Sequence, residues 1–232
     1  MFLLQLPAVR LLLRGLGLGV LSALLALLLS GFGALAPLER GASNSLFRLR
    51  GPRAAASKVV LLVVDEATVQ RAGHSPLPRR FYAQTLQSLR ARGARVIAFN
   101  FVFSSASDDA KQDTMVQRAV AARNDVTQGI IFDAPGAVAS PETLRRLPVF
   151  ALADQGARAR PALSVTAPLS SMMLKQTTIG HLNFRPEAGG EVRRIPHLIR
   201  FKGQLYPSFA LAAAMQSLGA RAEQSRHQGK SI

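Results

Sequence analysis

Asp65 and Glu66 are adjacent carboxylates, and such a pair could supply a general acid and a general base for catalysis. Consecutive side chains on a strand point to opposite faces, so these two carboxylates would diverge if they lay within a strand. The alternative is structural: Asp65 accepts hydrogen bonds from loop amides, because a buried carboxylate needs such donors. We favour the structural interpretation over direct contact with a ligand, and both stay open as hypotheses.

Arginines are the second group of residues that could bind a ligand. Arg193 and Arg194 follow Gly190, and adjacent guanidinium groups after a glycine turn could hold an anion through paired hydrogen bonds. The same two arginines could equally lie on a solvated hairpin edge, with one of them paired to a carboxylate. Arg79 stands at the expected start of a helix, where it could form an ion pair with Asp65.

The sequence contains none of the short motifs that mark common nucleotide, hydrolase or metalloprotease sites. It has no cysteine, and its four histidines lack the spacing of metal ligands and are expected at the surface or in turns. These are His74, His181, His197 and His227. We therefore expect no enzyme, no cofactor and no metal site. An enzyme that uses Asp65 and Glu66 is the alternative, and a non-catalytic membrane scaffold is a third hypothesis.

Two apolar runs, residues 59–64 and 95–103, are expected to be the strands that position these side chains. Neither alternates with polar residues, which is typical of parallel strands buried on both faces. Residues 79–91 between them have a helical pattern, so the unit is predicted to be βαβ with a right-handed crossover. Asp65 and Asn100 would then meet at the carboxyl edge of the sheet, where open α/β sheets bind ligands.

The remaining segments extend this prediction to a mixed, largely parallel α/β domain. Further strands are expected at residues 126–132, 179–184 and 197–201, with a turn at residues 188–190. Further helices are expected from Ser107 or Asp108 to about Arg123, near residues 141–147, and after Ser208, which would cap its helix.

Six segments in this order resemble the CHASE-type-two sensory domain, which is associated with bacterial cyclases and histidine kinases. Each segment is common alone, and the specificity of the match lies in their order over about 150 residues. The segments are Val64-Asp65-Glu66, Pro76-Leu77-Pro78-Arg79, residues 93–99 (Gly-Ala-Arg-Val-Ile-Ala-Phe), Gly180-His181-Leu182-Asn183, Gly190-Glu191-Val192-Arg193-Arg194 and Tyr206-Pro207-Ser208.

The resemblance implies a sensory domain for signal transduction with an unknown ligand, coupled in the family to a cyclase or kinase output. The candidate ligand-binding residues are Asp65, Glu66, Arg79, Asn100, Asn183, Arg193 and Arg194. The sequence departs from the family in having no Trp around the Pro-x-Pro element and Asn100 where the second strand usually ends in Asp. The family continues with further strands, transmembrane helices and an output domain, so we expect the domain to be incomplete at its C-terminus.

Residues 15–38 contain no charge and are long enough to cross a bilayer as a helix. The alternative is a cleaved signal peptide, because Ala34-Leu35-Ala36 has the small-x-small form of a cleavage site. Pro37 directly after that site fits cleavage poorly, so we favour an uncleaved anchor. Arginines are more frequent after the span than before it, which favours a cytoplasmic carboxyl side. The family resemblance implies the opposite orientation, and we follow it.

Gly15, Gly19 and Ala23 place small residues on one face of this anchor, where two helices could approach closely and form a homodimer. The net charge is +16, yet no basic run alternates with aromatic residues, so nucleic acid is not an expected partner.

The expected organisation is a single-pass protein of the bacterial cytoplasmic (inner) membrane, with its sensor domain periplasmic or extracellular. Its parts would be a basic segment at 1–14, a transmembrane anchor at 15–38, a juxtamembrane linker at 39–57, the sensor domain at 58–222 and a disordered tail at 223–232. The expected partners are therefore the lipid bilayer, an extracellular ligand and a second copy of the chain.

Overall fold

The computed structural model describes residues 7–54, 59–73, 75–135, 139–147, 159–174, 177–187 and 190–219. The chain divides into two compact units, Met1–Val63 and Val64–Ile232, and each is described by itself. The expected tail at 223–232 lies outside the described residues, as do Ala188 and Gly189 of the expected turn.

The first unit consists of two helices, α1 (Pro7–Gly31) and α2 (Ala36–Arg50). Within α1, Leu11–Gly31 is long and apolar enough to cross a membrane, with a mean hydropathy of 2.2. The apolar segment is not one helix over residues 15–38, because Gly33 adopts a φ of 70° and α2 begins at Ala36, with Pro37 in its first turn. Part of the expected linker is therefore helical, and α2 is followed by Gly51, which has a φ of 66°.

The second unit is built on three parallel strands, β1 (Ile97–Phe99), β2 (Val126–Phe132) and β5 (Thr178–His181), with β2 in the middle. The short strand β4 (Val165–Thr166) pairs antiparallel with the end of β2. A second sheet contains β3 (Arg160–Pro161), β6 (Leu198–Phe201) and β7 (Gln204–Pro207). β6 and β7 form a hairpin through Lys202 and Gly203, both with positive φ.

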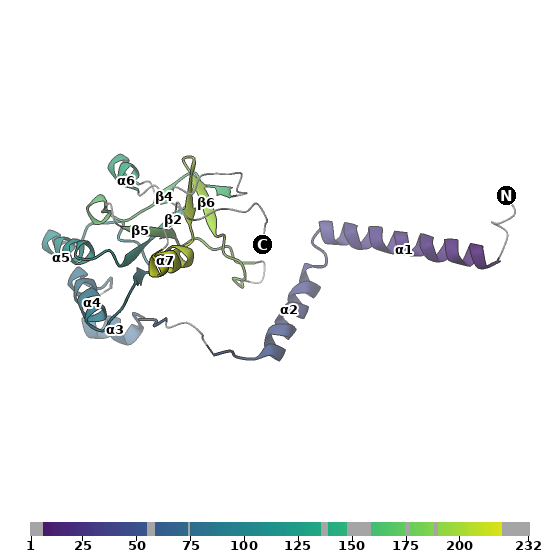
Figure 1. Ribbon diagram of the computed structural model, residues 1–232, viewed down its shortest axis with the longest axis horizontal. Coiled ribbons are helices and arrows are strands. Elements are labelled where there is room, and N and C mark those ends of the chain that lie inside the picture. The colour runs from purple at the N-terminus through teal and green to yellow at the C-terminus, as the bar shows by residue number, and fades with distance from the viewer. Residues whose placement is uncertain are drawn as a thin grey trace. The chain divides into compact units, whose positions relative to one another are not determined.

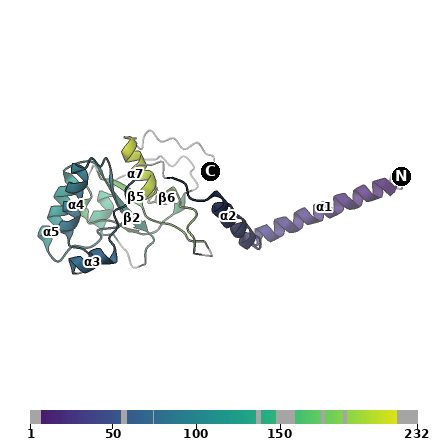
Figure 2. The same cartoon turned by 90° about the horizontal axis from the view of Figure 1, so that it is seen from below.

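Helices cover both faces of the central sheet. Val126 packs in one apolar cluster with Leu86 of α4 (Arg79–Ala91) and Val116 of α5 (Ala110–Ala121), and these two helices lie side by side (Figure 1, Figure 2). The next residue, Thr127, points to the opposite face and donates to Gln216 of α7 (Phe209–Leu218).

Close packing of α7 depends on a glycine in β5. A Cβ on Gly180 would lie 2.6 Å from the Cα of Phe209, so only glycine lets the helix approach this far. The shorter helices are α3 (Glu66–Ala72), α6 (Pro141–Arg146) and the 3₁₀ turn η2 (Ser170–Met172). The α/β class and most of the predicted strands and helices are thus confirmed, with Ser208 capping α7 as expected.

The prediction of a strand at residues 59–64 is wrong. This segment has no regular secondary structure, and its side chains are between 49% and 84% exposed. An apolar run becomes a strand only where a neighbouring backbone pairs with it, and among the described residues the parallel partner of β1 is β2. The expected βαβ unit therefore starts one strand later, as β1, α5 and β2.

Candidate functional site

The carboxyl edge of the central sheet brings together the residues that follow β1, β2 and β5. Because these strands are parallel, Asn100, Asp133 and Asn183 come after strand ends on the same edge. This edge remains the candidate site, and its geometry differs from the predicted one in several residues.

Arg79 is the most connected of the predicted site residues. Its Nε lies 3.1 Å from Oδ1 of Asp113, and its Nη2 donates to the carbonyl of Ser105 at 2.8 Å. The guanidinium carbon stacks 4.3 Å from the ring centre of Phe103. Arg79 therefore joins the start of α4 to the first turn of α5 and to the loop after β1.

The predicted ion pair between Arg79 and Asp65 is wrong, because Asp113 takes that place. Asp113 also accepts from the backbone N–H of Ser107 at 2.8 Å through its second oxygen. The side chains of Arg79 and Asp113 are only 13% and 14% exposed, so the pair is mostly shielded from water. Sequence analysis recognises Asp113 as an acid suited to the start of the predicted helix but does not pair it with Arg79.

Aromatic rings pack beside this ion pair. Phe99, Phe101 and Phe103 alternate along and beyond β1, and Tyr82 of α4 contacts all three with ring centres 5.0 to 6.3 Å apart. Burial raises the pKa of Tyr82, and the charge of Arg79 opposes that shift. The rings pack against one another, and this packing holds the segment that follows β1 against α4.

Asp65 lies outside this network and caps α3. It accepts hydrogen bonds from the N–H of Thr68 at 2.8 Å and from the Thr68 hydroxyl at 2.6 Å. The hydroxyl of Thr68, and after it the backbone N–H, lower the pKa of Asp65. Asp65 thus accepts hydrogen bonds, as the structural interpretation expects, but its donors belong to α3 and not to a loop. Asp65 and Glu66 are also exposed and not buried. A lowered pKa makes Asp65 a weaker base, which argues against catalysis by this pair.

Asn100 lies at the carboxyl edge as predicted, and Asn183, which was expected within the strand at 179–184, follows the end of β5 at the same edge. Asn183 completes the sheet, because its amide accepts from the N–H of Phe132 at 2.8 Å and donates to the carbonyl of Phe132 at 2.7 Å. The side chain therefore continues the ladder between β2 and β5 past the end of β5. Asn100 is exposed directly after β1.

The two arginines after the glycine turn differ from one another. Arg193 lies 3.7 Å from carboxylate oxygens of both Glu187 and Glu191, so the ion-paired alternative fits it better than an open anion clamp. Arg194 is exposed. Both belong to the segment between β5 and β6, away from the Arg79 network in the sequence.

A second buried ion pair, which sequence analysis missed, holds the opposite end of the sheet. Arg90 donates from Nε and Nη2 to the two oxygens of Asp125 at 2.8 and 2.6 Å. Its Nη1 donates to the carbonyl of Ala119, so the last turn of α4 is tied to α5 and to the start of β2. Asp125 is 2% exposed, and this role is structural.

His181 is also placed differently from the prediction. It was expected at the surface, but it is the last residue of β5 and is 1% exposed. A histidine on a strand buried on both faces cannot reach solvent, and the sequence signal was its apolar surroundings in residues 179–184. Among the described residues, no group of His, Asp or Glu could hold a metal ion.

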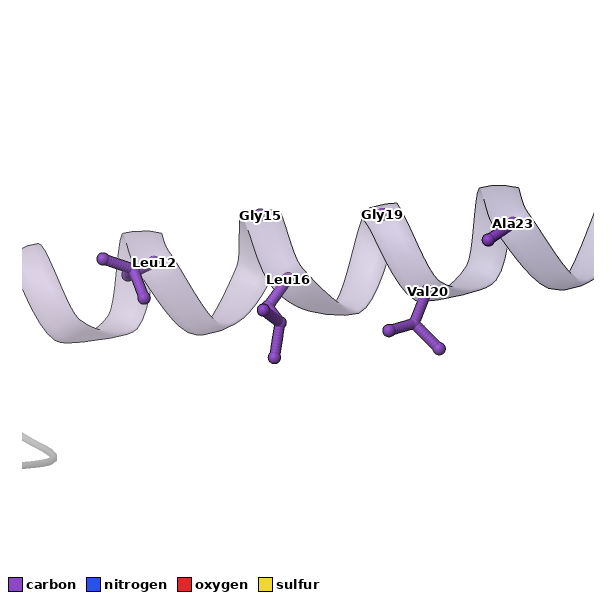
Figure 3. Close-up of a pocket in the computed structure, with 6 residues that line it drawn as sticks. All are labelled: Leu12, Gly15, Leu16, Gly19, Val20 and Ala23. Atoms are coloured by element: carbon purple, nitrogen blue, oxygen red, sulfur yellow. The ribbon is translucent and has the colours of Figure 1, made fainter.

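Two hollows in the described parts of the chain are lined by other residues than those of the candidate site. A groove along α1 is lined by Gly15, Gly19 and Ala23, which follow one side of the helix, with Leu12, Leu16 and Val20 beside them (Figure 3). A hollow of about 260 Å³ lies between α4 and α5 and includes Arg90 and Arg118. Neither contains a residue of the candidate site.

Comparison with protein families matches residues 20–231 to the CHASE2 domain. The match begins within α1 and extends through the whole α/β unit, so it covers most of the chain. No curated protein and no solved structure matches this sequence significantly.

Proposed function

The chain belongs to the CHASE2 domain family, whose members are sensory domains, and from this membership we propose that it is a membrane-anchored extracytoplasmic sensor. The α/β unit would receive a cue, and α1 would hold it at the cytoplasmic membrane with the unit on the outer side. Signalling would pass to a cyclase or kinase output. The observation that carries the proposal is the family match over residues 20–231.

We place the ligand at the carboxyl edge of the central sheet. Asn100 is exposed there, and the loop that follows it is fixed by the Arg79–Asp113 ion pair. A ligand bound by Asn100 could shift this loop relative to α4 and α5, because Arg79 contacts both Ser105 and Asp113. The other candidates for ligand contact remain Asp65, Glu66, Asn183, Arg193 and Arg194.

The test is a thermal-shift screen of the full chain in lipid nanodiscs against small carboxylates, amino acids and sugars. A ligand of the carboxyl edge should raise Tm in the native chain and lose this effect in Asn100→Ala. The matched control is Asn124→Ala, because Asn124 is also exposed but precedes β2 at the opposite edge of the sheet. A shift that persists in Asn100→Ala and disappears in Asn124→Ala would contradict the placement.

A further inference from the structure

His181 is a titratable side chain that the proposed ligand site does not use. It lies opposite Ile130 in the parallel register of β5 and β2, and its ring centre is 6.3 Å from that of Phe132. Phe132 in turn packs against Tyr206 of β7 at 5.4 Å. The imidazole is therefore enclosed by apolar and aromatic side chains.

Neither ring nitrogen of His181 makes a hydrogen bond within the described part of the chain. A neutral imidazole carries one donor and one acceptor, and buried polar groups are almost always paired. The carbonyl of Pro196 lies close enough to favour the protonated ring slightly, but it does not satisfy hydrogen-bond geometry. A buried histidine without hydrogen-bond partners therefore destabilises the closed structure around it.

The backbone of His181 lies where three elements meet. It forms a bridge to Ser208, and the N–H of Ser208 donates to the carbonyl of His197 at 2.7 Å. The hydroxyl of Ser208 caps α7 by accepting from Leu211. His181 therefore lies next to the β6–β7 hairpin and to the first turn of α7, and a change in its environment would affect both.

Two titratable groups belong to the elements next to His181, namely His197, which precedes β6, and Tyr206 of β7, which packs on Phe132. Burial first, and then the charge of the exposed His197, lower the pKa of His181 to about 4. Burial raises the pKa of Tyr206, so that ring brings no charge near neutral pH. Phe132 on β2 and Ser208 at the start of α7 carry no charge, and no carboxylate acts on this pKa.

We propose that His181 and His197 form a proton-responsive latch, in which acid detaches the β6–β7 hairpin and the start of α7 from the end of β5. A proton on His181 would add a charge with no counterion to an aromatic cluster, and the nearby imidazole of His197 opposes that charge further. Exposing the ring to water relieves that cost, so protons favour the opened form. The assignment of protons as a cue rests on the proposed sensor function, whereas the latch itself does not.

The size of the effect follows from linkage. In the opened form His181 takes a proton near its ordinary pKa of about 6.5, and in the closed form only near 4. Acidification between these two values therefore stabilises the opened form. From pH 7.5 to pH 5.0 the ratio of opened to closed molecules should rise about 30-fold.

The experiment uses the full chain in lipid nanodiscs. Histidines labelled with ¹³C at Cε1 are titrated by NMR, and amide hydrogen exchange of residues 198–211 is followed between pH 7.5 and 5.0, corrected for the intrinsic exchange rate. The variants are His181→Gln, His181→Phe and His197→Gln. The phenylalanine variant fills the aromatic cluster without a titrating group, so it keeps the test available if glutamine disturbs folding.

The expected results are a His181 midpoint well below 6.5 and an opening ratio that rises about 30-fold on acidification in the native chain. Both His181 variants should lose most of that rise, and His197→Gln should move the His181 midpoint upward. A midpoint at or above 6.5, an equal rise in the His181→Phe variant, or an unchanged midpoint in His197→Gln would each overturn the latch. None of these results depends on ligand binding at the carboxyl edge, so failure of the sensor proposal is detected separately.

Discussion

At the scale of single residues, the Arg79–Asp113 and Arg90–Asp125 ion pairs are expected to contribute more to stability than the exposed carboxylates of Asp65 and Glu66. Arg90 and Asp125 satisfy one another through two hydrogen bonds, and Asp125 is almost fully buried. Removing one partner of such a pair leaves an uncompensated charge. Asp65 is exposed and bonded only within its own turn.

Asp125→Ala should therefore lower the free energy of unfolding by about 3–5 kcal/mol, because Arg90 would remain buried without its counterion. Asp65→Ala is the control, and its effect should be much smaller because it removes only a solvent-exposed helix cap. Chemical denaturation of the full chain in detergent measures both. Equal losses for the two variants would contradict the assignment of Asp125 as the buried anchor.

The limits of sequence reasoning are clearest at this scale. Asn183 was named as a candidate ligand residue within an expected strand, but its pairing with Phe132 joins residues 51 apart in the chain, and the sequence carries no local signal for it. The Arg79–Asp113 contact similarly spans 34 residues. Which acid an arginine meets is decided by helix packing, and periodicity does not contain that information.

Elements were easier to predict than contacts. β2 was predicted with its observed bounds, although Thr127, Gln128 and Gly129 interrupt its apolar residues. Its Ile and Phe residues and the turn signal that starts at Asp133 are typical of a strand and its end. The helix at 79–91 was predicted from the helical spacing of Phe81, Leu86 and Leu89. Leu86 is buried and Leu89 partly buried as this pattern implies, whereas Phe81 is exposed and Ala83 is buried in its place. Residues 59–64 are more uniformly apolar than β2 but form no strand, because strand formation also requires a neighbouring backbone that pairs with the segment.

The contact of α7 with the sheet gives a prediction for two glycines. Gly180→Ala should destabilise the α/β unit by about 1–3 kcal/mol, because the new Cβ would meet the backbone of Phe209 at 2.6 Å. Gly129→Ala is the matched control on β2. Its Cβ would meet mainly the flexible side chain of Leu182, which can move, so the loss should be smaller. Thermal unfolding measures the stability of both variants. A larger loss of stability for Gly129→Ala than for Gly180→Ala would contradict this prediction.

The groove along α1 gives a prediction about association in the membrane. Gly15 and Gly19 have no atom within 4 Å of an added Cβ, so larger side chains there cost nothing within one copy of the helix. If Gly15, Gly19 and Ala23 form a homodimer contact, Gly15→Leu with Gly19→Leu should reduce pairing of α1 in a bilayer association assay. Gly17→Leu is the control, since Gly17 is equally unobstructed but lies off the small-residue face. Loss of pairing in Gly17→Leu alone would exclude this face.

The whole molecule combines an apolar helix with an α/β unit, and its topology is the first property to test. Leu11–Gly31 should keep the chain in the bilayer through alkaline carbonate washing. Release of a shortened chain that begins near Pro37 would instead identify a signal peptide.

The orientation of the chain in the membrane is a separate prediction. A reporter active only in the periplasm, fused after Ile232, should be active if the family orientation outweighs the arginine distribution. Activity of a cytoplasmic reporter at the same position would reverse the orientation.

The exposed run at residues 59–64 has a consequence for the behaviour of the protein in solution and in the cell. Six β-branched or leucine side chains without charge or proline have the composition of segments that nucleate aggregates. Lys58 on one side and Asp65 with Glu66 on the other place charges at both of its ends, where gatekeeper residues oppose stacking of such segments. The double variant Asp65→Asn, Glu66→Gln keeps a side chain able to cap α3 but removes both negative charges. It should scatter more light at a given protein concentration with little change in Tm, so that the carboxylates that first suggested catalysis would act instead to keep the chain soluble.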